Sequence, residues 1–134
     1  MFCDTVTVYN YRAGQWFPTI ITNAELQSEN AAKENNSGAS SSDGALLLVN
    51  ISGNAVGGKE YVSPEAYARL SSPEGFVTFA PGDLFVVGGF SGIVNDDDYI
   101  DGFYSHLNEE NSGCFKIISV KRFKLLPHFE IGGA

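Results

Sequence analysis

The sequence predicts a mainly β protein, a small β-barrel or sandwich with one short helix and long loops. Short runs rich in β-branched and aromatic residues recur along the chain, and turn residues, including 15 glycines, separate them. Hydrophobic residues make up 43% and aromatic residues 13% of the 134 residues. This is enough apolar material for one folded domain over residues 1–134.

The first strands are predicted near the N-terminus. Residues 5–11 alternate and are rich in Thr, Val and Tyr, which indicates a strand. Residues 12–15 form a turn of hairpin length with the required glycine, and residues 16–22 form the return strand. Pro18 places that strand at an edge or a bulge. Trp16, the only tryptophan, is either a core residue or an interface anchor.

A long polar segment follows. Residues 28–43 contain no apolar side chain larger than Ala, so they cannot bury enough surface to offset the entropy of ordering. We predict a flexible loop there, which either becomes ordered on a partner or is a tolerated insertion. Residues 45–51 read as a central strand, and the Gly-rich residues 52–59 read as a turn, because they lack the P-loop pattern.

The best helix signal in the chain is at residues 63–70. Ser63 is the predicted N-cap and Pro64 the first helical residue. Ala66, Tyr67 and Leu70 then have the spacing of a core-facing side, over about two turns.

The stretch from Pro81 to Gly89 is the predicted centre of the fold. Its residues 84–87 are apolar without alternation, which suits a strand buried on both faces. With residues 76–79 it predicts a hairpin whose tip is 80–83, where Gly82 supplies the turn.

The last third of the chain predicts a long connection at 91–113 and two strands. Tyr99, Phe103 and Leu107 have the spacing of one face of a short helix. Residues 114–120 form a strand with Phe115 and Ile117 on one face and Ile118 and Val120 on the other. Residues 127–131 alternate and close the sheet.

The bulk composition excludes several classes of protein. A net charge of −8 argues against tight, nonspecific binding of nucleic acid, which needs clustered Lys and Arg. No apolar run approaches the roughly 20 residues that span a bilayer, and no signal peptide is visible. Cys3 and Cys114, the only cysteines, can pair, but two are too few to define a disulfide framework, and we expect free thiols.

The acidic segment at residues 95–102 does not fit a calcium site. Counted from Asp97, the third position is Tyr99 and the twelfth is Asn108, where an EF-hand needs an oxygen ligand and a bidentate Glu. The remaining interpretations are a solvated loop and an electrostatic contact with a basic partner. We expect no metal and no cofactor. His106 and His128 match no catalytic or metal motif, so an enzyme is not predicted.

The basic residues are also clustered, which raises the possibility of self-association. Half of them lie within residues 116–124, while six of the sixteen acids lie within 96–110. A monomer with one acidic and one basic patch suits head-to-tail contacts, although the same charges could simply keep the protein soluble. The interface candidates are Asp96, Asp97, Asp98, Tyr99, Asp101, Phe103, Lys116, Lys121, Arg122 and Lys124.

The order of four segments resembles the head–tail connector proteins of tailed bacteriophages, the head-closure or stopper type that is often called minor capsid protein. The segments are the strand at 6–10, Tyr-Val-Ser-Pro-Glu at 61–65, residues 76–79 with Gly82, Asp83 and Gly89, and residues 117–120 with 126–131. The acidic residues 95–101 and the loop 28–43 lie outside this resemblance.

The resemblance implies a virion protein that is assembled in the cytoplasm of a bacterial host. It implies a β-barrel that forms a sixfold or twelvefold ring of its own copies, between a portal or adaptor protein above and a tail protein below. Packaged DNA would pass through the channel without sequence-specific binding, and no membrane is involved. A different hypothesis remains open, a monomeric barrel that binds a ligand or partner in a cleft near Tyr99 and Phe103.

Overall fold

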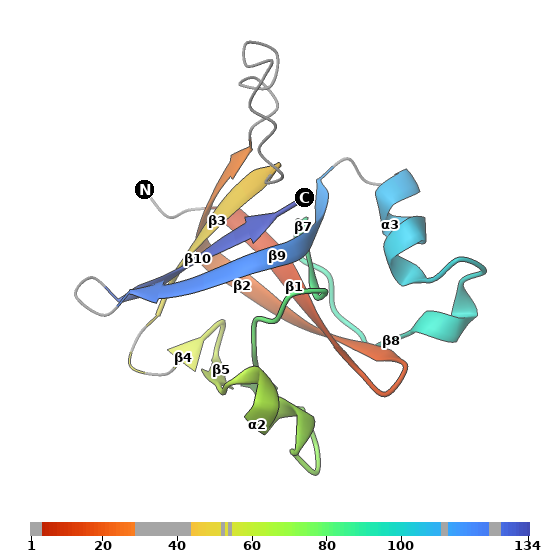
Figure 1. Cartoon of the computed structure of the whole chain (residues 1–134), viewed down its shortest axis with the longest axis horizontal. Helices are drawn as coiled ribbons and strands as arrows, with labels where there is room; N and C mark the ends of the chain where they lie inside the picture. Colours follow the sequence, from red (N-terminus) through yellow and green to blue (C-terminus); the bar gives the residue numbers. More distant parts are fainter. Residues whose placement is uncertain (1–3, 29–43, 52, 54, 111–112, 124–126) are drawn as a thin grey trace.

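The computed structural model of the chain is a closed β-barrel with a small second sheet below it (Figure 1). It describes residues 4–28, 44–51, 53, 55–110, 113–123 and 127–134, so Cys3, Lys124 and nearly all of the predicted loop 28–43 lie outside the described residues. The elements in chain order are β1 (Asp4–Arg12), β2 (Gln15–Ser28), β3 (Ala45–Asn50), β4 (Ala55–Val56), β5 (Lys59–Tyr61), α2 (Pro64–Ala68), β6 (Phe76–Val77), β7 (Leu84–Val87), β8 (Val94–Asn95), η1 (Asp96–Asp98), α3 (Phe103–Glu110), β9 (Cys114–Phe123) and β10 (His128–Gly133).

Six strands close the barrel, as the mainly β prediction requires. Hydrogen-bonded neighbours follow the order β1, β7, β9, β10, β3 and β2, and β2 then pairs with β1. All these pairings are antiparallel. β8 pairs with the start of β2, on the side of β2 away from β1. Of the two architectures that the sequence left open, the barrel is correct, and its closure pairs the strand edges that an open sheet would expose.

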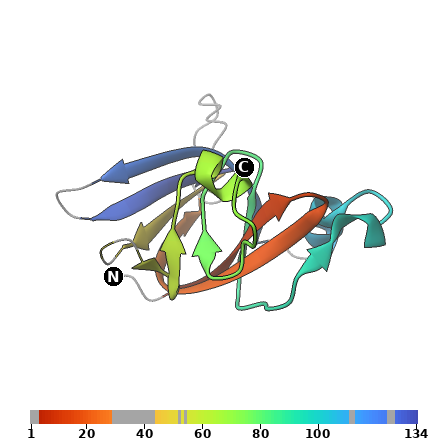
Figure 2. The same cartoon turned by 90° about the horizontal axis from the view of Figure 1, so that it is seen from below.

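The second sheet closes one end of the barrel. It has the order β4, β5, β6, and with α2 it lies below the barrel, as Figure 2 shows from that side. Val56, Val77 and Phe79 are buried in the same apolar cluster as the barrel interior. Residues 52–59, predicted only as a turn, therefore contain a short hairpin, whose turn uses Gly57 and Gly58 with φ of 61° and 80°. Positive φ is easy for glycine because it has no Cβ.

Two apolar clusters explain why β1 and β7 are buried on both faces. One fills the barrel and includes Val8 and Phe85. The other lies where α3 packs beside the barrel, and includes Tyr9, Leu84 and Phe103. The prediction of a doubly buried strand is confirmed for the first three residues of β7, while its fourth, Val87, is 46% exposed.

The predicted hairpin between residues 76–79 and 84–87 is wrong, although its turn is present. Asp83 N–H donates to the Ala80 carbonyl, and Gly82 has φ of 98°. However, β6 pairs in parallel with β5, while β7 pairs with β1 and β9. The turn thus carries the chain from the small sheet into the barrel. Local apolar pattern cannot distinguish these two outcomes, because it marks a strand without identifying its partner.

A β-bulge changes which side chains of β9 enter the barrel. The pairing with β10 shifts between Ser119 and Ile117, so that Ile118 is an extra residue. Val120 consequently packs against the interior cluster that contains Ile117, instead of lying on the opposite face as predicted. An inserted residue reverses the alternation of the strand beyond it.

Several local predictions are confirmed. Pro18 lies at an edge, since Lys59 Nζ donates to its carbonyl from the side away from β1 (2.7 Å). Ser63 caps α2 by accepting from Ala66 N–H (3.2 Å), and Pro64 is its first residue. The helix is shorter than the predicted two turns, and only Tyr67 is buried in it. No helix in the described part of the chain is long and apolar enough to cross a membrane.

Candidate functional site

The acidic segment after β8 is an ordered turn that Asp96 holds in place. Asp96 Oδ1 accepts from Trp16 Nε1–H and from Phe103 N–H, each at 2.9 Å. These bonds, first that from the Phe103 backbone, lower the pKa of Asp96. Asp96 therefore has a structural role, and the exposed carboxylates left for a partner are those of Asp97, Asp98 and Asp101. Among the described residues, no three His, Cys, Asp or Glu side chains form a metal-binding group.

The two aromatic interface candidates pack against the protein itself. Phe103 is 4% exposed and contacts the rings of Tyr9 and Trp16. Tyr99 is half-buried and packs on Phe103, with ring centroids 5.3 Å apart. Trp16, at 7% exposure, is likewise a core residue. Phe103 is thus a core residue of the α3 cluster, and its truncation would disturb the fold before it affected a partner.

The fully exposed side chain in this segment is one that the sequence analysis did not select. Ile100 lies between the acidic residues 96–98 and Asp101, and it is 100% exposed. The available signal was its position as an aliphatic residue inside an acidic run, but that pattern does not say whether it points inward. In the structure Tyr99 packs toward α3, and Ile100, the next residue, points outward.

The basic candidates divide between the two ends of the molecule. Lys116 lies beside α3, with its Nζ 4.6 Å from the centre of the Tyr104 ring. Lys121 and Arg122 lie near the far end of β9, which is opposite η1 and α3 along the longest axis (Figures 1 and 2). Arg122 covers the rings of Tyr61 and Phe129, at 5.5 and 5.4 Å. The structure therefore separates the predicted basic cluster and leaves Lys121 and Arg122 as the basic end.

A buried polar pair, missed in the sequence, connects β1 to the turn before β7. Asn10 is 1% and Asp83 is 6% exposed. Asn10 Nδ2–H donates to Asp83 Oδ2 (2.9 Å) and to the Thr78 carbonyl (2.6 Å), while Asn10 Oδ1 accepts from Thr78 N–H (3.3 Å). Tyr11 N–H donates to the other Asp83 oxygen (3.1 Å). The Asn10 side-chain amide thus makes the two hydrogen bonds with the Thr78 backbone that a neighbouring strand would otherwise make. In this way it connects the segment after β6 to β1.

We expect the stability of the protein to fall as the pH rises through the titration of Asp83. Burial raises the pKa of Asp83 from 3.8 to about 6, although the bonds from Asn10 and Tyr11 oppose the shift. Because the folded state holds this proton more tightly than the unfolded chain, the stabilisation is complete below the unfolded pKa and is lost above the folded one. The loss is about 2 kcal/mol between pH 4 and 7. Denaturant unfolding at both pH values measures it.

The variant Asp83→Asn serves as the control for this pH effect. Residue 83 cannot titrate in this variant. Its free energy of unfolding should therefore lack the decrease between pH 4 and 7 that Asp83 causes in the wild type, even if the variant is more or less stable overall. A pH profile for Asp83→Asn that parallels the wild-type profile would show that another group is responsible.

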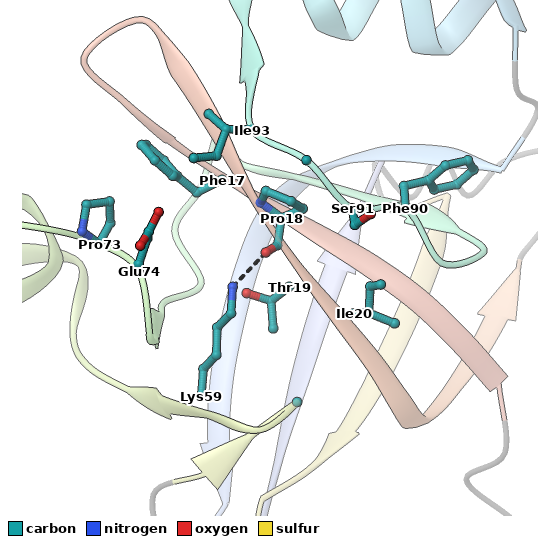
Figure 3. A pocket seen from close by; sticks show the side chains of 12 residues that line it. Phe17, Pro18, Thr19, Ile20, Lys59, Pro73, Glu74, Phe90, Ser91 and Ile93 are labelled. Atoms are coloured by element: carbon teal, nitrogen blue, oxygen red, sulfur yellow. Dashed lines mark hydrogen bonds between the residues drawn. The ribbon is translucent and has the colours of Figure 1, made fainter.

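A groove lies along the outer side of β2, and Figure 3 shows the residues that line it. It has a volume of about 460 Å³ and includes Phe17, Ile20, Phe90 and Ile93 in its lining. Lys59 reaches it from β5 and donates to the Pro18 carbonyl, as drawn in Figure 3. β2 pairs with β8 only at Gln15 and Trp16 and with β3 only from Ala24 onward. The groove therefore lies along a stretch of β2 that pairs with no second strand on this side within the described residues.

A protein-family model matches the chain over residues 1–134, and its description is "Family of unknown function (DUF6751)". No curated protein matches the chain, and no solved structure matches it. The family match covers the closed barrel, the acidic turn and the groove together. The chain therefore belongs to the DUF6751 family.

Proposed function

We propose that this chain is a structural virion protein that forms a ring in the head–tail connector of a tailed bacteriophage. In this role it closes the head after DNA packaging and offers a docking surface to the tail. The observation that supports the proposal is the separation of charge on one closed barrel, with Asp97, Asp98 and Asp101 at one end and Lys121 and Arg122 at the other. Opposite patches at opposite ends favour head-to-tail contacts, which close into a ring when the rotation permits.

The proposed partners follow from the resemblance to head–tail connectors, and the geometry and the net charge are compatible with them. Each copy contacts two others, in a ring for which the resemblance implies sixfold or twelvefold symmetry. A portal or adaptor protein lies above and a tail protein below. With a net charge of −8, the ring would let packaged DNA pass without strong phosphate contacts. No catalytic step is assigned to the chain.

The alternative is a monomeric ligand-binding barrel with a cleft near Tyr99 and Phe103. A pocket of about 370 Å³ does lie against Tyr99 and His106, but Phe103 is buried and does not line it. In the described residues, side chains such as Val8, Leu47 and Phe85 fill the barrel interior. The alternative predicts a monomer that is not retained on phage heads.

The ring proposal predicts that Lys121→Glu lowers the occupancy of this protein on purified heads that carry the portal. Each exposed pair contributes only about 0.2–1 kcal/mol, but the ring repeats the contact at every interface. Adding Asp97→Lys in the same chain should restore part of the occupancy. Occupancy is measured by quantifying the protein on sedimented heads at low and high salt, and the difference should shrink at high salt.

Lys116→Glu is the matched control, because it makes the same charge change in the same strand but at the acidic end. It should not lower occupancy, because it only adds negative charge to the end that is already acidic. Arg122 is kept in all variants, since it packs on Tyr61 and Phe129 and its loss would disturb the fold. Absence of wild-type protein from the heads would contradict the proposed function. Equal effects of the Lys116 and Lys121 variants would contradict the assigned ends.

A further inference from the structure

The acidic turn presents an aliphatic side chain outward in a fixed position. Tyr99 N–H donates to the Asp96 carbonyl and Gly102 N–H to the Tyr99 carbonyl, both at 3.2 Å. The Tyr99 ring packs on Phe103 and on His106, at 5.3 and 4.5 Å between ring centroids. Ile100 is held at the tip of this turn and is 100% exposed. A single exposed apolar side chain is common on protein surfaces. Ile100 therefore indicates a contact only if another surface offers a site that can bind it.

The groove beside β2 has the shape and the lining to receive such a side chain. Three of its apolar residues are themselves exposed: Ile20 at 38%, Phe90 at 40% and Ile93 at 46%. They come from β2 and from the segment before β8, and Figure 3 shows them around the uncovered stretch of β2. A concave apolar surface with a few polar groups is the usual form of a binding site.

The groove also carries a charge that complements the acidic turn. Lys59 Nζ gives one hydrogen bond to Pro18, and an ammonium has three donors. Burial lowers the pKa of Lys59, while the nearby Glu74 carboxylate opposes the shift. Glu74 also lines the groove and is exposed, and its carboxylate offsets the burial of Lys59 only in part, because the pKa of Lys59 is lowered overall. A carboxylate delivered to Lys59 by a partner would offset the cost of burying the ammonium.

From these observations we propose that Ile100 of one copy docks in the β2 groove of the next copy, where Asp98 and Asp101 flank it beside Lys59. Within one copy Ile100 is fully exposed and the groove is open, so the two do not meet there. The contact therefore joins two copies. In the proposed ring it is heterologous, because each copy gives Ile100 to one neighbour and receives Ile100 from the other. This contact rests on the proposed function and refines it. Ile100, and not the buried Phe103, is the apolar side chain that anchors the contact.

The groove extends from β5 to the segment before β8, so Phe17 and Ile93 lie near the acidic turn of the same copy while Lys59 reaches the groove from β5. Lys59 and Tyr61 are two residues apart on β5, and both are half-buried, which places them on one face of the strand. Arg122 covers the Tyr61 ring.

Sedimentation velocity of the purified full chain tests this contact without phage heads. Wild type should self-associate at concentrations up to about 1 mM. Ile100→Asn and Ile93→Asn should each weaken the association by about 10-fold or more, as expected for removing one buried aliphatic side chain. Ile118→Asn is the matched control, because it changes an exposed isoleucine on the β9 bulge without altering the charge, and it should associate like wild type.

Mixing the two variants is the sharper measurement. Each retains one intact face, so an equimolar mixture of Ile100→Asn and Ile93→Asn should form dimers that do not grow further. A wild type that stays monomeric, an Ile100→Asn variant that associates normally, or a mixture without dimers would overturn the inference. A chain that associates in this way but is absent from heads would overturn only the connector proposal, whereas full occupancy of heads by Ile100→Asn would overturn only this contact.

Discussion

Asn10→Asp is expected to destabilise the barrel by about 3–5 kcal/mol at pH 7, and by much less at pH 4. The new carboxylate would face the Thr78 carbonyl and Asp83 at the positions where the Asn10 amide now donates at 2.6 and 2.9 Å. Two buried carboxylates in contact cannot both ionise without a large cost, so protonation at low pH relieves the repulsion. Denaturant unfolding at the two pH values gives both free energies relative to wild type.

Asn10→Leu separates the charge effect from the loss of hydrogen bonds. Its side chain is of similar size, and it loses the same bonds without adding a carboxylate. It should therefore be destabilised at both pH values, with a smaller difference between them than Asn10→Asp shows. An equal cost of Asn10→Asp at pH 4 and pH 7 would mean that Asp83 and residue 10 are not in contact in the folded protein.

Phe85→Ala is expected to cost a similar amount, about 3–5 kcal/mol, with no dependence on pH. Phe85 is fully buried at the centre of the barrel and stacks on Phe115, with ring centroids 5.3 Å apart. Its ring also fills the space above Gly133, where an added Cβ would lie only 2.7 Å from two ring atoms. Removing the ring leaves a cavity that the paired strands around it cannot collapse to fill. Urea unfolding measures the loss.

Gly133→Ala tests the same contact from the other side. In the wild-type background we expect a cost of about 1–3 kcal/mol from overpacking against Phe85. In a Phe85→Leu background the cost should be smaller, because the ring atoms nearest the new methyl group are gone. Additive costs in the double variant would show that the two positions do not press on each other. Phe90→Ala, at a ring that is 40% exposed, should change stability little.

Sequence alone identified most of the strands and turns, because these depend on local properties. The alternating residues 5–11 and the continuous apolar residues 84–86 lie in strands of the barrel, and so does the closing segment from His128 onward. Gly14 and Gly82 have the positive φ that their turns require. A periodic pattern or a glycine restricts the backbone near itself, so it can be recognised without knowing the rest of the fold.

The partners of these elements were not predictable in the same way. Residues 76–79 carry a strand pattern, but Phe76 and Val77 pair with β5, and Asn10 satisfies the backbone of Thr78. Asn10 and Asp83 look like ordinary polar residues in the sequence, and they become a buried pair only because β1 and β7 lie side by side. Pairing over such sequence distances depends on the global topology.

The candidate interface shows the same division between sequence and structure. Sequence alone determined that the chain is mainly β, that it is acidic, and that it concentrates acid at residues 95–102. Tertiary structure decided that Phe103 is buried and Ile100 exposed, since the packing of α3 and Tyr99 orients this turn. It also brought Lys59 to the carbonyl of Pro18 and so formed the groove. Composition gives the chemical groups that a segment offers, whereas the direction in which each side chain points is set by contacts with residues far away in the chain.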